Sequence, residues 1–127
     1  MTHKILIADD EPNILISLEY LMKREGFDVS VARDGQEAVD AIRAVRPDLV
    51  LLDVMMPKKT GFEVLQEVRA DDGLTQISII LLTAKGRDTD QTKGLALGAD
   101  AYMTKPFSTR ELVEKVRELL SNPRRAN

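Results

Sequence analysis

Short apolar runs alternate with segments of helical period along the whole chain. The runs have the length of strands and lie at about 4–8, 27–32, 48–53, 77–82 and 101–104. Apolar residues recur every three or four positions in the segments that follow, which predicts helices over about 12–25, between a turn at 34–35 and Pro47, over about 61–70 and 88–97, and from Ser108 onward. Strands that alternate with helices indicate βα units and a parallel sheet.

Proline, glycine and serine mark the expected helix boundaries. Pro12 suits the first turn of the first helix, and Gly26 suits its end. Pro47 ends the second helix, and Gly98 ends the fourth. The tetrapeptide from Ser108 to Glu111 has the pattern of a capping box, which predicts the start of the fifth helix.

Five strands and five helices in strict alternation predict an α/β fold of the flavodoxin-like, doubly wound kind. Its five-stranded parallel sheet has the order 2-1-3-4-5, in which the first strand lies beside the third. We expect one domain over residues 1–121, followed by a polar tail over 122–127. A length of 127 residues with 43% apolar content is sufficient for one such core.

Composition excludes several classes of function. The net charge is −3 with acids and bases interleaved, which gives no basic patch for direct nucleic-acid binding. The absence of cysteine excludes disulfides and thiolate metal sites. The apolar runs reach about six residues, too short to cross a bilayer, and no signal-peptide pattern opens the sequence. We therefore expect a soluble cytoplasmic protein without a membrane partner.

Polar groups stand at the ends of four of the apolar runs. Asp9 and Asp10 follow the first, Asp53 ends the third, and Thr83 and Lys105 follow the fourth and fifth. The carboxyl ends of parallel strands share one edge of a sheet, so these groups are expected to converge. Each of them alone is more simply a turn former, a helix cap or a solvated charge.

Three neighbouring carboxylates repel one another unless a proton or a cation intervenes. Oxygen ligands completed by water suit Mg²⁺ and leave a position for a phosphoryl oxygen. A carboxylate can also attack a phosphoryl group, and Asp53 on the central strand is the best-placed nucleophile. Asp9 and Asp10 are then metal ligands, while Lys105 pairs with a phosphoryl oxygen and Thr83 donates a hydrogen bond to another.

Four segments of the chain resemble the receiver domains of bacterial two-component response regulators, of the chemotaxis-regulator kind. The resemblance extends over about 4–120 and rests on ILIADDE at 5–11, PDLVLLDVMMP at 47–57 with Gly61 following, LTA at 82–84, and GADAYMTKPF at 98–107.

The resemblance implies a role for each residue of the acidic group. Asp53 is the expected phosphoacceptor. Asp10, Asp53 and the backbone carbonyl of Met55 are the expected direct ligands of Mg²⁺, and Asp9 is expected to act mainly through a water molecule. Met55 and Lys85, two residues beyond Asp53 and Thr83, are positions that tune autodephosphorylation in this family.

The resemblance also implies a switch. Thr83 and Lys105 are expected to contact the phosphoryl group, and Tyr102 is expected to follow when the threonine moves inward. A half-buried strand tyrosine without a signalling role is the alternative for Tyr102. The bond between Lys105 and Pro106 is expected to be cis.

Together these features predict a phosphorylation-dependent signalling receiver rather than an enzyme, with intrinsic Mg²⁺-dependent autophosphorylation and autodephosphorylation. His3 is the single histidine and precedes the first strand, so a histidine kinase, a phosphotransfer protein or a small acyl phosphate must donate the phosphoryl group. The expected output face is formed by the fourth helix, the fifth strand and the fifth helix, and acts on a downstream protein target or effector domain.

Two further alternatives stay open. The chain is either a stand-alone receiver or the amino-terminal receiver of a transcription factor. Gln91, Thr92 and Ala101 replace the basic, apolar and acidic residues of the usual dimer face, so that Glu111 and Lys115 lose their partners. This favours a stand-alone receiver or one with a different class of output.

The second alternative is a Mg²⁺-dependent small-molecule phosphatase, for which residues 58–60 (Lys-Lys-Thr) are the one candidate specificity loop. Flavin binding is a weaker option, and the P-loop motif of nucleotide hydrolases is absent from the sequence.

Overall fold

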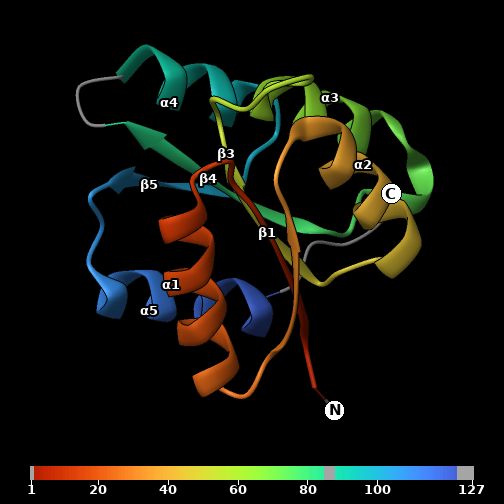
Figure 1. Ribbon diagram of the computed structural model, residues 1–127. Coiled ribbons are helices and arrows are strands. Elements are labelled where there is room, and N and C mark those ends of the chain that lie inside the picture. The colour runs from red at the N-terminus through yellow and green to blue at the C-terminus, as the bar shows by residue number, and fades with distance from the viewer. Residues whose placement is uncertain (1, 85–87, 123–127) are drawn as a thin grey trace.

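The computed structural model describes residues 2–84 and 88–122 as a sheet flanked by helices on both faces (Figure 1). Its strands are β1 (Lys4–Ala8), β2 (Asp28–Ala32), β3 (Leu49–Asp53), β4 (Ser78–Ala84) and β5 (Ala101–Lys105). Its helices are α1 (Pro12–Arg24), α2 (Gly35–Val45), α3 (Gly61–Ala70), α4 (Asp88–Ala96) and α5 (Thr109–Ser121), with a 3-10 turn, η1, at Asp72–Leu74. All paired strands are parallel, in the order β2-β1-β3-β4-β5. The predicted flavodoxin-like fold is confirmed.

The fourth and fifth strands run further than the apolar runs predict. β4 continues through Thr83 to Ala84 because those residues pair with Thr104 and Lys105 of β5. Thr83 and Lys105 therefore lie within the sheet rather than in the loops beyond it. The short turn η1 was not predicted, because its sequence carries no apolar period.

Alternate residues along the strands point to opposite faces of the sheet and pack into two separate hydrophobic cores. Ile5 and Ile7 of β1 pack with the apolar faces of α1 and α5, whereas Leu6 and Ala8 pack with α2 and α3. Figure 1 shows the same division, with α1 and α5 on one side of the sheet and α2, α3 and α4 on the other. Every residue of β3 is buried, as expected for a central strand covered on both faces.

Within the described residues, side-chain caps fix the beginnings of α2, α3 and α5. Asp34 caps α2 by accepting a hydrogen bond from the backbone N–H of Glu37 at 2.8 Å. Ser108 caps α5 by accepting from the N–H of Glu111, which is one half of the capping box predicted there. The full reciprocal capping box forms at α3, between Thr60 and Glu63. Among the described residues no helix has the length and apolar content needed to cross a membrane.

A partly buried ion pair joins α3 to the amino ends of β4 and β5. The guanidinium of Arg69 donates to Asp100 Oδ2 at 2.9 Å, to the carbonyl of Ile77 at 2.7 Å and to that of Gly98 at 2.9 Å. The same Asp100 oxygen accepts from the N–H of Ile79 at 2.7 Å. The pair therefore sets the register at which β4 and β5 begin, and so the position of Thr83 and Lys105 at their far ends.

Arg69→Met should lower the free energy of unfolding by about 3–5 kcal/mol, because it removes the arginine cation from the largely buried carboxylate of Asp100. Arg110→Met is the matched control, since Arg110 pairs with Glu114 while 89% of its side chain is exposed; its effect should stay below about 1 kcal/mol. Urea unfolding of both variants measures the difference. Equal losses for the two arginines would contradict a structural role for the Arg69 pair.

Candidate functional site

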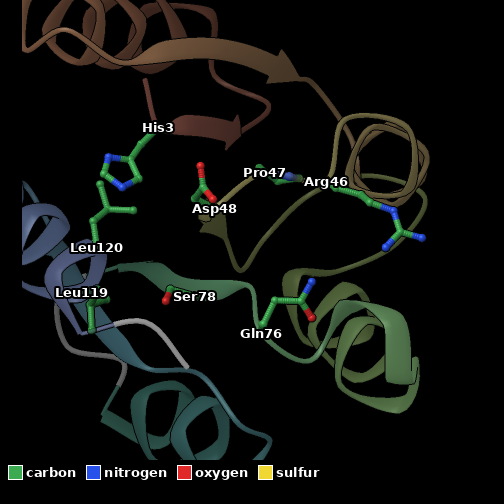
Figure 2. Close-up of a pocket in the computed structure, with 8 residues that line it drawn as sticks. All are labelled: His3, Arg46, Pro47, Asp48, Gln76, Ser78, Leu119 and Leu120. Carbon is green, nitrogen blue, oxygen red and sulfur yellow. The ribbon is translucent and has the colours of Figure 1, made fainter. Parts of the chain in front are cut away.

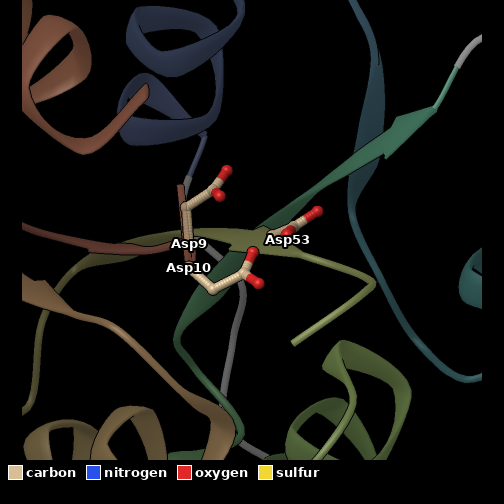
Figure 3. Close-up of side chains that lie close together, drawn as sticks. All are labelled: Asp9, Asp10 and Asp53. Atoms are coloured by element: carbon tan, nitrogen blue, oxygen red, sulfur yellow. The ribbon is translucent and has the colours of Figure 1, made fainter. Parts of the chain in front are cut away.

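Three carboxylates meet at the edge of the sheet where the strands end, here called the carboxyl edge. Asp9 and Asp10 follow β1, and Asp53 is the last residue of β3, the strand beside β1. One oxygen from each carboxylate lies within 4.8 Å of the others. Figure 3 shows the three side chains grouped at the ends of the two strands. The structure thus brings together the acids that the strand order predicts to be neighbours.

The carboxylate of Asp9 is held in place on both oxygens. Its Oδ1 accepts a hydrogen bond from the backbone N–H of Glu11 at 2.9 Å, and its Oδ2 accepts one from Lys105 Nζ at 2.8 Å. The Asp9 side chain is fully buried, whereas Asp10 is exposed. Asp10 and Asp53 consequently have the freer oxygen atoms, and Asp9 is the acid least able to take a further direct ligand.

Lys105 reaches across the sheet edge from β5. Its ammonium lies 3.4 Å from Asp53 Oδ1 and 3.9 Å from Glu11 Oε1, in addition to its bond with Asp9. The direct contact between Lys105 and Asp9 was not predicted, because the sequence analysis gave Lys105 only a phosphoryl partner. The Lys105–Pro106 peptide bond is cis.

Charge is not balanced in this group. Burial, and then the charge of Asp9, raise the pKa of Asp53 to about 7, against the lowering effect of Lys105. Burial alone would lower the pKa of Lys105, but its hydrogen bond to Asp9 and the charges of Asp53, Asp9 and Glu11 outweigh burial and raise it. Lys105 therefore stays protonated, while the acids retain an excess of negative charge that favours binding of a further cation.

Two of the three acids, Asp10 and Asp53, line a cleft of about 270 Å³. Asp10, Asp53 and Lys105 form part of its wall, together with Met55, whose side chain is 59% exposed. Glu11 also lines it; the sequence analysis missed this residue, although its position directly after two site acids was a usable signal.

Asp90 of α4 lines the cleft as well and was also missed, because nothing in its surrounding sequence distinguishes it from a surface acid. Lys85, the second predicted tuning position, lies outside the described residues.

Thr83 lies beside the cleft with its hydroxyl buried. The side chain is 1% exposed, and its Oγ1 has no hydrogen-bond partner within the part of the chain that the structure describes. Buried hydroxyls are normally paired, so this one marks a place where a partner is expected. Tyr102, the predicted switch residue on β5, is 39% exposed.

A second cleft, of about 280 Å³, lies at the opposite edge of the sheet (Figure 2). His3, Arg46 and Asp48 contribute to its wall beside Leu119 and Leu120 of α5. It contains none of the predicted site residues. The sole histidine of the chain is therefore at the edge away from the acids.

The chain matches the family model of the response regulator receiver domain over residues 5–117. The match includes each acid of the group, Thr83 and Lys105. The chain therefore belongs to the response regulator receiver domain family, and the resemblance drawn from its sequence is confirmed.

Solved structures of this family are similar to the chain over nearly its whole length. The receiver domain of the Francisella response regulator 1452 is 33% identical, with a TM-score of 0.88 and coverage of 95% of this chain and 98% of that one. The chemotaxis response regulator CheY4 of Vibrio cholerae is 29% identical, with a TM-score of 0.87 and coverage of 94% and 99%.

A third structure contains a metal ion. The receiver domain of the sensor histidine kinase PA1611 from Pseudomonas aeruginosa is 28% identical, with a TM-score of 0.87 and coverage of 95% and 99%. Its active-site cleft holds a coordinated magnesium ion.

The raised pKa of Asp53 predicts a pH-dependent stability in the presence of EDTA. The folded protein binds the proton more tightly than the unfolded chain, so the free energy of unfolding should fall as pH rises from about 4 to about 7 and then level off. Asp53→Asn removes this fall. At pH 8 the variant should be more stable than the wild type by about 1–4 kcal/mol.

Urea unfolding at pH 4.5 and pH 8 measures the effect, with the exposed Asp28→Asn as the control. A gain in stability for Asp53→Asn that is equal at both pH values would contradict the raised pKa.

Proposed function

We propose that this receiver domain accepts a phosphoryl group on Asp53 and passes the change to a protein partner. The observation that carries the proposal is the position of Asp53: its carboxylate lines the cleft, lies beside two other acids and is 3.4 Å from Lys105 Nζ. This arrangement supplies a nucleophile with both a fixed cation and a cluster of oxygen ligands around it.

The donor set fits Mg²⁺. Carboxylates without nitrogen or sulfur ligands suit a hard cation, and the single charge of Lys105 does not neutralise three acids. Asp10, Asp53 and the backbone carbonyl of Met55 would hold the ion. When bound, Mg²⁺ supplies positive charge that keeps Asp53 deprotonated and offsets the charge of the phosphoryl oxygens.

In the transfer step, an oxygen of the Asp53 carboxylate attacks phosphorus and forms an acyl phosphate. The bond from phosphorus to the donor breaks, and the leaving group, an imidazole nitrogen or an acetate oxygen, takes the electron pair. Lys105 is close enough to turn from Asp53 to a phosphoryl oxygen. Thr83 has a hydroxyl that gains a partner when it donates to another of these oxygens.

The donor is external to the chain. His3 lies at the opposite edge of the sheet from Asp53 and cannot deliver a phosphoryl group within one molecule. Receiver domains interact with histidine kinases or histidine phosphotransfer proteins, and such a protein is the proposed donor here.

The proposed output face comprises α4, β5 and α5. Tyr102 is partly exposed on it, and Leu95 of α4 is 45% exposed. Residues that would bridge a transcription-factor dimer have partners within the chain instead: Gln91 donates to Thr104, and Lys115 pairs with Glu118 at 2.9 Å. These contacts support output through a protein partner rather than through that dimer.

The lysines of the loop at 58–60, the candidate specificity loop of a small-molecule phosphatase, are already paired with acids of this chain. Lys59 pairs with Glu67 at 2.7 Å, and Lys58 lies 3.7 Å from Asp34. Neither lysine lines the cleft of the acids. The phosphatase alternative thus loses the one group that the sequence offered for it.

Intact mass spectrometry after incubation with acetyl phosphate and Mg²⁺ tests the proposal. The wild type should gain one phosphoryl group, and Asp53→Asn should gain none, because an amide is not a nucleophile for this transfer. Asp28→Asn should behave as the wild type, and EDTA should abolish the gain. A folded wild-type protein that gains nothing from acetyl phosphate or from a histidine kinase would contradict the proposal.

Thr83→Val should weaken binding of a phosphoryl mimic without lowering the stability of the fold. The substitution removes a buried hydroxyl that makes no hydrogen bond, so the free energy of unfolding should stay level or rise by up to about 1 kcal/mol. Binding of beryllofluoride with Mg²⁺, which mimics the phosphoryl group, should weaken about tenfold, since a hydrogen bond to a charged group is lost. Urea unfolding and a beryllofluoride titration measure the two effects; beryllofluoride affinity equal to that of the wild type would exclude Thr83 from the phosphoryl contacts.

A further inference from the structure

The helix α4 has the weakest apolar attachment to the sheet. Only Gly94 of its described residues is fully buried, and Leu95 is 45% exposed. Gly94 packs directly on β4, because an added Cβ would collide with the side chain of Leu81. Lys93 adds a cation–π contact with Phe62 of α3, with its ammonium 4.6 Å from the centre of the ring. A helix with so little buried apolar surface depends strongly on each polar contact that it makes.

One such contact joins α4 to β5. The side-chain amide of Gln91 donates from Nε2 to Thr104 Oγ1 at 3.1 Å, and the pair is partly buried. Thr104 immediately precedes Lys105 in the chain. The bond therefore links α4 to the strand that carries the lysine of the acidic site.

The Gln91–Thr104 bond lies on the same face of the sheet as Thr83. Ala101 and Met103 of β5 pack with the core on the α1 and α5 side, so Tyr102 and Thr104 point to the opposite face. Thr104 is the register partner of Thr83 on the adjacent strand.

Leu81, two residues before Thr83, belongs to the core on the α2 and α3 side, which places Thr83 on that face too. The two threonines thus stand side by side, one with its hydroxyl bound to α4 and the other with its hydroxyl unpartnered within the described part of the chain.

We propose that the hydrogen bond between Gln91 and Thr104 is a latch that holds α4 on β5 in the unphosphorylated chain. It thereby sets the free energy needed to change the conformation of the output face. The inference rests on the proposed function and extends it to two positioning residues outside the acidic cleft. A shift of Thr83 toward the phosphoryl group opens space beside Thr104, on the face that Tyr102 shares. The latch keeps α4 over that space, so it stabilises the resting arrangement by the free energy of one hydrogen bond.

Removing the latch should therefore favour the phosphoryl-bound form. A net hydrogen bond in a protein corresponds to about a two- to tenfold change in an equilibrium. Gln91→Leu and Thr104→Val should each speed amide hydrogen exchange in α4 by this factor and tighten beryllofluoride binding by a similar factor. The double variant should match the single ones, because both substitutions remove the same bond.

Thr92→Val is the matched control. The hydroxyl of Thr92 donates to the backbone carbonyl of Asp88 within α4 and is exposed, so it does not join the helix to the sheet. This variant should leave beryllofluoride affinity at the wild-type value. Hydrogen exchange followed by mass spectrometry and a beryllofluoride titration with Mg²⁺, on the full 127-residue chain, supply both readouts.

Unchanged exchange in α4 for Gln91→Leu and Thr104→Val would overturn the latch. Faster exchange with beryllofluoride affinity unchanged would overturn its coupling to the acidic site, and leave a contact that only supports the helix. If the wild type binds no beryllofluoride and takes no phosphoryl group, the proposed function and the coupling both fail, while the exchange rates still decide whether the bond holds α4.

Discussion

Asp9, Asp10 and Asp53 place three carboxylates at one edge of the sheet, and Lys105 is the cation paired with them among the described residues. Burial, and then the charge of Asp9, raise the pKa of Asp53 to about 7, and the single lysine, which binds most closely to Asp9, leaves the three acids with excess negative charge. The excess charge causes repulsion among the carboxylates at this edge, and binding of a further cation relieves it. Lys105 Nζ also lies 3.4 Å from Oδ1 of Asp53, the proposed nucleophile, close to where a phosphoryl charge would form.

The fold produces this imbalance through strand order. β1 lies beside β3, which sets Asp9 and Asp10 against Asp53, while β4 and β5 bring Thr83 and Lys105 from the other side. The core on each face buries the strands up to the point where the acids begin, so Asp9 and Asp53 lose water that would screen them. At the far end of β4 and β5, Arg69 and Asp100 fix where the strands start. The position of the site is thus a property of the whole sheet rather than of one loop.

Much of this was predictable because period, turn residues and strand order are local or topological properties. The alternation of apolar runs with helical segments defines the sheet, and its order implies that Asp9, Asp10 and Asp53 meet. The contacts of Lys105 with Asp9, 96 positions apart, and of Arg69 with Asp100, 31 apart, were not predictable in this way. Such pairs depend on side-chain reach across elements, about which hydrophobic periodicity carries no information. The bond between Gln91 and Thr104 belongs to the same class, and it was visible only once α4 had been placed on β5.

Carboxyl-carbon NMR of Asp53 across a pH titration tests the charge imbalance most directly. In EDTA its apparent pKa should lie near 7, and with saturating Mg²⁺ it should fall well below that value, because the bound cation favours the charged form. A pKa near the ordinary value of about 4 under both conditions would contradict an uncompensated acidic group at this edge of the sheet.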